Sequence, residues 1–279
     1  MQEIPSLKDT VTQYGLLAKK SLGQNFLLDM NVTNKIIRST LEAQKKDSFT
    51  GEAVYEIGPG PGGLTRAILA ANPQKLTVIE MDKRCIQIMQ ELQSAGHPEL
   101  IIVEGDALQY NFCQDNKVPT NIISNLPYNI SVPLLLNWLK DITQFSSLTL
   151  MFQKEVAERI LALPNNKNYG RLSVIAQLTS HIKPLFNLNP NCFVPAPKIW
   201  STVLLFQPKE KAIDKKLLHM VEKITELAFG QRRKMLRQSL KSLPNLESFC
   251  AQLDIPLTAR GENITPEQYL QLAQLYLKG

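Results

Sequence analysis

Between residues 53 and 152 the sequence alternates short, nearly continuous apolar runs with longer stretches whose apolar residues recur at helical spacing. Apolar runs rich in β-branched residues and Leu are typical of strands buried on both faces, as in a parallel sheet covered by helices. We therefore predict an α/β fold with a mostly parallel, Rossmann-like sheet. Its first five strands are expected at Ala53–Ile57, Leu76–Glu80, Leu100–Val103, Asn121–Ser124 and Leu148–Phe152.

The intervening stretches predict helices, at Leu64–Ala71, Lys83–Ser94 and Val132–Leu139. Two later strands, His181–Leu188 and Thr202–Phe206, flank a proline-bearing loop and are expected to pair as an antiparallel edge. The segment Pro208–Ile213 is typical of a linker, and the patterns after it are all helical: Leu217–Phe229, Lys234–Leu243, Leu246–Leu253 and Pro266–Leu277. We predict an α/β domain over residues 1–207, with an N-terminal arm over residues 1–50, and a small all-helical domain over residues 208–279.

Several classes of protein are disfavoured by composition. No apolar run approaches the roughly 20 residues that cross a bilayer, and the N-terminal residues lack the apolar core of a secretory signal. The four cysteines and three histidines are scattered without metal-ligand spacing. We therefore expect a cytoplasmic protein, a monomer, with no membrane contact and no metal.

The basic charge is concentrated in one segment. The chain has a net charge of +6, and Lys209–Lys241 holds ten basic and four acidic residues, which accounts for the whole excess. Such a patch indicates a polyanionic partner, nucleic acid before membrane, although a solvated helix face fits the charge equally well. The candidate RNA-binding residues are Arg232, Arg233, Lys234 and Arg237.

A glycine-rich turn follows the first predicted strand. Gly58, Gly60 and Gly63 satisfy the pattern G-x-G-x-x-G, in which glycines let the backbone turn tightly and approach a ligand. Glu80 ends the second strand, about where an acid binds ribose hydroxyls in nucleotide-cofactor sites. These residues indicate a nucleoside cofactor without distinguishing NAD or FAD from other classes.

The third strand distinguishes the cofactors better. It is followed by Asp106, which can accept a hydrogen bond from an adenine amino group. Glu56, just before the glycine turn, would repel a pyrophosphate, whereas adenosine joined to a short amino-acid tail suits this arrangement. The pattern therefore favours S-adenosylmethionine (SAM).

The fourth strand ends in Asn125-Leu126-Pro127-Tyr128. The Asn125 side chain can bond to an amide-like edge, and the Tyr128 ring offers a stacking surface. A flat base with an exocyclic amino group could be held there, since extruded bases are usually stacked on aromatic side chains. The motif indicates a nucleobase substrate beside the methyl donor.

Together these motifs resemble the ribosomal RNA adenine dimethyltransferase family, and within it the KsgA/RsmA group that acts on the small subunit. The resemblance covers nearly the whole chain, and it rests on six segments in order: Tyr14–Asp29, Glu56–Thr65, Asn125–Tyr128, Phe193–Ser201, Arg232–Leu236 and Ile264–Tyr269. The departures from the family pattern are Ser21-Leu22 and Trp200, which bear on RNA contact rather than on chemistry.

The resemblance implies a Rossmann-like, class I SAM-dependent methyltransferase and assigns roles to its residues. The cofactor-binding set is expected to be Asn25, Leu27, Gly58, Gly60, Glu80, Asp106, Ala107 and Asn125. Asn125 and a main-chain carbonyl near Leu126 are expected to accept the two amino hydrogens of the target adenine. The resemblance also implies that this base stacks on Tyr128 and meets Phe193.

The expected reaction is transfer of methyl groups from SAM to N6 of two adjacent adenosines near the 3′ end of 16S rRNA, giving N6,N6-dimethyladenosine. The expected partners are this rRNA and the assembling 30S subunit. Three alternatives remain open at this point. They are a sister enzyme acting on large-subunit 23S rRNA, a non-catalytic nucleic-acid-binding relative, and an NAD-dependent oxidoreductase.

Overall fold

The computed structural model describes residues 5–16, 25–112 and 118–278; Ser21, Leu22 and Cys113 lie outside this range. The chain divides into two compact units, each with its own internal packing. The first unit comprises Met1–Leu135, Gln144–Lys154 and Lys183–Gln207. The second unit comprises Leu136–Thr143, Glu155–Ile182 and Pro208–Gly279, so it adds two earlier segments to the C-terminal helices.

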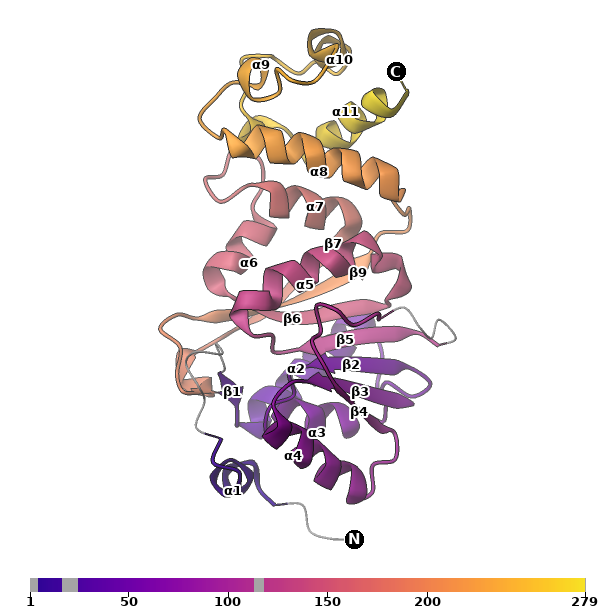
Figure 1. Cartoon of the computed structure of the whole chain (residues 1–279), viewed down its shortest axis with the longest axis vertical. Coiled ribbons are helices and arrows are strands. Elements are labelled where there is room, and N and C mark those ends of the chain that lie inside the picture. The colour runs from indigo at the N-terminus through magenta and orange to yellow at the C-terminus, as the bar shows by residue number, and fades with distance from the viewer. Residues whose placement is uncertain (1–4, 17–24, 113–117, 279) are drawn as a thin grey trace. The chain divides into compact units, whose positions relative to one another are not determined.

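A seven-stranded sheet forms the framework, with strand order β4-β3-β2-β5-β6-β9-β7. Figure 1 shows β4, β3, β2, β5 and β6 side by side in this order. These five strands are parallel, as predicted, and β9 runs antiparallel to β6. The two later strands, β7 and β9, are neighbours at one edge, as expected. The bounds are β2 Ala53–Ile57, β3 Lys75–Glu80, β4 Leu100–Glu104, β5 Thr120–Ser124, β6 Ser147–Gln153, β7 Ser180–Leu188 and β9 Ser201–Pro208.

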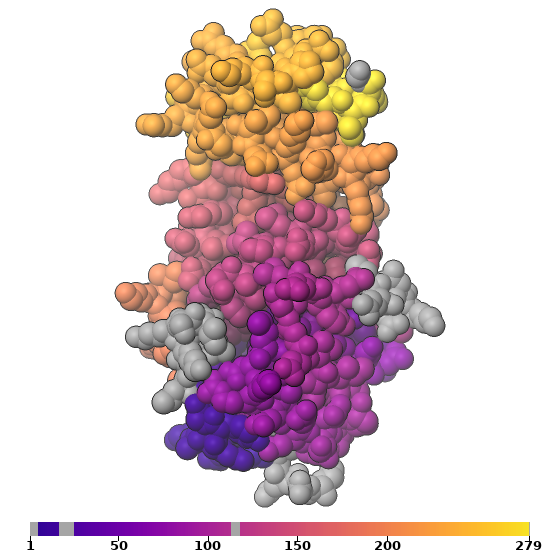
Figure 2. All heavy atoms as spheres, in the orientation of Figure 1, coloured from indigo at the N-terminus to yellow at the C-terminus, as the bar shows by residue number. Residues whose placement is uncertain are grey.

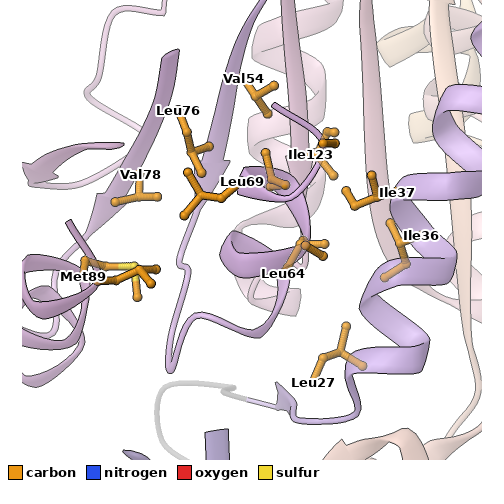
Figure 3. Packing of buried hydrophobic residues seen from close by; sticks show 14 of the residues in the cluster. Leu27, Ile36, Ile37, Val54, Leu64, Leu69, Leu76, Val78, Met89 and Ile123 are labelled. Carbon is orange, nitrogen blue, oxygen red and sulfur yellow. The ribbon is translucent and has the colours of Figure 1, made fainter. Parts of the chain in front are cut away.

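The main core of the first unit lies on one face of the sheet. Three helices cover this face: α2 (Met30–Gln44), α3 (Gly63–Leu69) and α4 (Lys83–Ser94). Figure 3 shows their apolar side chains gathered against Val54, Leu76 and Val78, all of which are fully buried. Because successive strand residues alternate between faces, Tyr55 points to the other face, where its ring contacts Tyr110 and Phe112.

The N-terminal region is more regular than the arm that the sequence predicted. It contains α1 (Leu7–Gln13), a short strand β1 (Phe26–Leu27) and the 15-residue helix α2. Asp29 caps α2 by accepting a hydrogen bond from the Asn31 N–H at 2.8 Å. Helix α1, indigo in Figure 2, lies on the surface of the unit, where the Tyr14 hydroxyl donates to Glu91 of α4.

The turn between β2 and α3 is shaped by its glycines. Gly58, Gly60 and Gly62 have positive φ angles of 63°, 55° and 86°, a conformation that favours glycine. β1 packs directly on this turn, and a Cβ at Gly60 would lie 2.9 Å from the Phe26 ring. β1 also pairs antiparallel with β8 (Phe193–Val194), so three segments far apart in the sequence meet here.

Helices and short connections make up the second unit. Its α-helices, with α5 and α6 beginning in the first unit, are α5 Tyr128–Lys140, α6 Lys154–Leu161, α7 Arg171–Thr179, α8 Lys215–Gly230, α9 Leu236–Ser239, α10 Leu246–Gln252 and α11 Pro266–Lys278. The 3₁₀ helices among the described residues are η2 Ile142–Gln144, η3 Pro190–Cys192 and η4 Gly261–Asn263. None of the described helices has the length and apolar composition to cross a membrane.

The helix predicted over Lys234–Leu243 is wrong in its extent, because only Leu236–Ser239 is α-helical. Met235 instead forms a short antiparallel bridge with Arg260, and the Lys234 N–H bonds the Gln231 carbonyl in a turn. The tertiary pairing with Arg260 thus overrides the local helical pattern.

Residue Tyr169, between α6 and α7, is fully buried and its hydroxyl donates to the Ile264 carbonyl at 2.9 Å, which ties the loop to the start of α11.

We predict that Gly63→Ala destabilises the protein by about 1–3 kcal/mol, the usual cost of overpacking a filled site. The reason is that a Cβ at Gly63 would lie 2.3 Å from the main-chain oxygen of Leu27, which a rotamer change cannot relieve. Urea unfolding measures the effect. Gly230→Ala is the control, because no atom lies within 4 Å of its Cβ. Equal stability of the two variants would contradict the proposed close contact.

Candidate active site

The candidate site lies where the parallel strands end and consists of two adjoining open pockets. The wide pocket has a volume of about 540 Å³, in the usual range for small-ligand sites, and is lined by Gly58, Glu80, Asp82, Asp106, Ala107 and Pro127, among others. The narrow pocket, about 70 Å³, is lined by Asn25, Leu27, Gly60, Glu56, Asn125 and Tyr128, among others. Gly58, Glu80 and Pro127 line both pockets, so the two are continuous.

Glu80 is held at the junction of the two pockets. Its side chain is buried, and Oε1 accepts hydrogen bonds from the Met81 N–H at 2.7 Å and the Asp82 N–H at 2.9 Å. Oε2 accepts from the Gly60 N–H at 3.4 Å. Burial raises the pKa of Glu80, while these three backbone donors oppose that rise. The donors fix the carboxylate in one orientation and leave it acceptor capacity for ligand hydroxyls.

Asp106 and Ala107 lie at the far side of the wide pocket, after β4. Asp106 Oδ1 accepts from the Leu108 N–H at 2.9 Å and Oδ2 from the Gln109 amide at 3.4 Å, so a local turn orients the carboxylate. Ala107 is buried, and its small side chain leaves room against the pocket wall. The lining of the wide pocket therefore includes carboxylates from the end of β3 and from the turn after β4.

Glu56 has a place in the site beyond the repulsion of a pyrophosphate that its position in the sequence indicates. The structure brings its carboxyl to the narrow pocket, only 2% exposed, with the Thr65 hydroxyl donating to Oε2 at 2.6 Å. Burial raises the pKa of Glu56 to about 8; the Thr65 hydrogen bond lowers it, and the negative charge of Glu80 raises it further. Its position as the polar residue of a fully buried strand was the signal that could have found it.

Asn125 is oriented by the N-terminal segment. Its Nδ2 donates to the Asn25 carbonyl at 2.9 Å, so the amide is turned with its donor side toward β1 and its oxygen is available as an acceptor. The preceding Ser124 hydroxyl donates to the Ile57 carbonyl at 2.7 Å, which joins the ends of β5 and β2. Leu126, the next residue of the motif, is buried and also lines the narrow pocket.

Tyr128 lies at the mouth of the narrow pocket, half-buried, with its hydroxyl 3.1 Å from the Ser201 hydroxyl. Burial raises the pKa of Tyr128, so the phenol is neutral at physiological pH. Phe193 has a different setting: its side chain is 2% exposed within the hydrophobic core, and it is not among the residues that line either pocket. It reaches the site through the pairing of its backbone with Leu27.

The basic candidates lie in the second unit and differ in their surroundings. Arg232 donates to the carbonyls of Lys167 at 2.5 Å and Tyr169 at 3.0 Å and to the carboxylate of Glu262 at 3.2 Å. Arg233, Lys234 and Arg237 are exposed. Arg232 therefore stabilises its own unit, while the other three side chains present their charge to solvent. Within the part of the chain that the structure describes, no group of three or more His, Cys, Asp or Glu could hold a metal ion.

Solved structures with this architecture define the class of protein. A dimethyladenosine transferase from Plasmodium falciparum superposes with a TM-score of 0.73, is 26% identical, and the match covers 90% of this chain and 96% of that one. The 23S rRNA methyltransferase ErmE has the same fold, with a TM-score of 0.67 at 23% identity, over 91% and 100% of the two chains. The fold is that of a class I SAM-dependent methyltransferase.

The family follows from sequence similarity. The family model described as ribosomal RNA adenine dimethylase matches residues 15–278. Proteins named ribosomal RNA small subunit methyltransferase A are 43% identical in Rhodospirillum rubrum, over 97% of this chain and 92% of that protein, and 45% identical in Sinorhizobium medicae, over 97% of each. The chain belongs to the ribosomal RNA adenine dimethylase family and is a methyltransferase.

We predict that Glu56→Gln stabilises the protein increasingly as the pH rises from roughly 5 to roughly 8. The folded-state pKa of Glu56, about 8, lies above the ordinary value of 4.5, so in this interval unfolding releases a proton and stability falls as the pH rises. Each pH unit costs up to about 1.4 kcal/mol, and glutamine removes this cost while keeping an acceptor for Thr65.

Urea unfolding at several pH values measures the difference between variant and wild type. Glu155→Gln is the control, because the Glu155 side chain is 61% exposed and its replacement is expected to leave the pH dependence unchanged. A difference for Glu56→Gln that stays constant across this pH range would show that the buried carboxyl is already ionised at its lower end.

Proposed function

We propose that this enzyme transfers methyl groups from SAM to N6 of two adjacent adenosines near the 3′ end of small-subunit rRNA, giving N6,N6-dimethyladenosine. The observation that carries the proposal is the oriented Asn125 amide beside the Tyr128 ring, next to a pocket lined by Glu80 and Asp106. Relatives above 40% identity over almost the whole chain bear the name of small-subunit methyltransferases, which supports the same substrate.

The pockets suit SAM. The glycine turn provides a side-chain-free surface for the amino-acid tail at Gly58 and Gly60, and Asn25 and Leu27 of the N-terminal segment cover it. Glu80 would accept the ribose hydroxyls, and Asp106 with Ala107 would hold the adenine. When bound, SAM supplies an electrophilic methyl group that is already activated by its positive sulfur.

Most of the catalytic work left to the protein is positioning. The lone pair of the adenine amino nitrogen is delocalised into the ring, which makes this nitrogen a poor nucleophile. The Asn125 Oδ1 and the main-chain carbonyl near Leu126 would accept its two hydrogens and favour a more tetrahedral nitrogen. Its proton becomes acidic only as the new bond forms, so attack does not require prior removal of the proton by a base.

Tyr128 would hold the plane of the target base by stacking, which is worth on the order of 1–3 kcal/mol per base. Stacking constrains the plane of a base more than its rotation, so a monomethylated amino group could turn for the second transfer. The Ser201 contact keeps the Tyr128 ring in place during both rounds. Phe193 would support this edge of the site through the paired strands β1 and β8, and contact of its ring with the base remains our expectation from the family.

The remaining partners follow from this assignment. We assign SAM binding and catalysis to residues 1–207 and RNA binding to residues 208–279, where Arg233, Lys234 and Arg237 would contact rRNA phosphates. Arg232, the fourth basic candidate, is also exposed and would support that surface through its hydrogen bonds to neighbouring loops of its unit. The substrate would be the assembling 30S subunit, and the enzyme would act on it as a monomer in the cytoplasm. The likeness to ErmE, at 23% identity, concerns the fold and gives no support for a large-subunit target.

The decisive experiment supplies radiolabelled SAM and three acceptors: small subunits lacking the modification, their deproteinised RNA, and large-subunit RNA. We expect label in the small subunits, recovered as N6,N6-dimethyladenosine after digestion. Label confined to large-subunit RNA would overturn the substrate. SAM binding without transfer to any acceptor would favour a binding protein that keeps the fold.

We predict that Asn125→Ala and Glu80→Ala impair different steps. Asn125→Ala is expected to lower kcat about 100-fold or more, as for loss of a group that acts mainly in the transition state, with the Kd for SAM changed only a few-fold. Glu80→Ala is expected to raise that Kd about tenfold or more, because hydrogen bonds to a charged group are lost. Calorimetric binding and steady-state kinetics separate the effects. If both variants changed the same parameter, either kcat or the Kd for SAM, these roles would be contradicted.

We predict that replacing Arg233, Lys234 and Arg237 together by Ala weakens RNA binding and flattens its salt dependence. Each phosphate contact adds about 0.7–0.9 to the slope of log K against log salt, so the slope should fall by about 2–3. Titrations between roughly 50 and 200 mM salt measure it. Arg232→Ala is the contrasting variant, expected to lower the thermal midpoint because it breaks contacts within its unit. An unchanged slope in the triple variant would show that these side chains form a solvated face that does not contact RNA.

A further inference from the structure

Trp200 is a large aromatic residue with no role in the site described so far. It lies just before β9, in the loop that follows β8, and 46% of its surface is exposed. The chain has two tryptophans, and the other, Trp138, is only 3% exposed.

The backbone at Trp200 is fixed relative to the active site. Its carbonyl accepts a hydrogen bond from the Lys154 N–H at 2.8 Å, and the next residue, Ser201, is paired with Gln153 of β6. The hydroxyl of the same Ser201 lies 3.1 Å from the Tyr128 hydroxyl. Trp200 is therefore the immediate chain neighbour of the residue that contacts the ring proposed to carry the target base.

The surroundings of Trp200 are apolar and basic. Ile199 is 37% exposed, and two exposed cations are near in the chain or bonded to it: Lys198, two residues before Trp200, and Lys154, whose N–H bonds the Trp200 carbonyl. An exposed ring flanked by positive charge is the combination with which proteins hold single-stranded nucleic acid, since bases stack on the ring and phosphates pair with the cations. A solvent-facing indole beside two lysines fits an RNA strand, which offers flat bases and negative phosphates. It fits an apolar protein surface without acidic residues less well.

We propose that Trp200 is a stacking platform for a nucleotide next to the target adenosine, with Lys154 and Lys198 contacting the adjoining phosphates. The proposal rests on the RNA substrate proposed above and extends it by one nucleotide. Tyr128 holds the base that reacts, and Trp200 holds its neighbour, so that the strand is bound at two points as the target base enters the narrow pocket. Trp200 is a positioning residue, and it touches neither SAM nor the reacting nitrogen.

Tryptophan fluorescence tests the contact directly. A short single-stranded RNA containing adjacent adenosines is expected to quench the emission of the wild-type protein in a saturable way. Trp200→Phe, which leaves only the buried Trp138, is expected to show no such change. RNA that binds, as judged by filter retention, without quenching the wild-type emission would overturn the proposal.

Kinetics on small subunits test the consequence. Trp200→Ala is expected to raise the KM for small subunits about tenfold, the effect of losing one stacked base, with kcat and the Kd for SAM within twofold of wild type. Trp200→Phe should restore most of the affinity, because it keeps a ring. Leu163→Ala is the matched control, since Leu163 is an apolar residue that is 66% exposed in the second unit. A KM for Trp200→Ala within twofold of wild type would overturn the proposal.

The lysines give an independent measurement. Lys154→Ala and Lys198→Ala are each expected to lower the salt slope of RNA binding by about 0.7, the value for a single-strand phosphate contact. Lys75→Ala, at the opposite end of the parallel strands, is expected to leave the slope unchanged. If the wild type methylates no acceptor, the proposed function fails and the fluorescence titration still decides whether Trp200 binds RNA. If the wild type methylates small subunits and Trp200→Ala does so equally well, only this inference fails.

Discussion

The active site depends on the close contact between β1 and the glycine turn. Without side chains at Gly60 and Gly63, the ring of Phe26 and the main-chain oxygen of Leu27 can lie directly on the turn. That contact brings the Asn25 carbonyl to the Asn125 amide and aligns β1 with β8. One steric condition thus joins the N-terminal segment, the cofactor turn and the target-base motif. The first and last of these lie 100 residues apart in the chain.

Two buried carboxyl groups beside this contact differ in how the fold satisfies them. Glu80 receives three backbone N–H donors, which compensate much of the loss of solvent around its charge. Glu56 receives one hydroxyl from Thr65 and is kept largely neutral by burial. The site therefore presents a carboxyl held by three backbone donors at the proposed ribose position and a nearly neutral carboxyl in the narrow pocket, a distinction that two glutamates in a sequence do not reveal.

The parallel strands could be predicted because each contains an apolar run, a local pattern that is recognisable without knowing which strands pair. Helix α2 was missed, although Ile36, Ile37 and Leu41 have helical spacing, because polar residues surround them and no glycine or proline marks its ends. The helix expected from Lys234 was shortened by the bridge between Met235 and Arg260. Local patterns thus fail where a residue's partner lies far along the chain.

The sequence by itself determined the sheet, the glycine turn and the order of the motifs, since these follow from apolar periodicity and from residue types with restricted backbone preferences. All of its candidate cofactor residues line the two pockets. Only the tertiary structure decided which way the Asn125 amide faces, that Glu56 is buried at the site, and that Trp200 stands exposed one residue from the Tyr128 contact. Hydrogen-bond direction and burial depend on neighbours that folding brings together, so no local pattern encodes them.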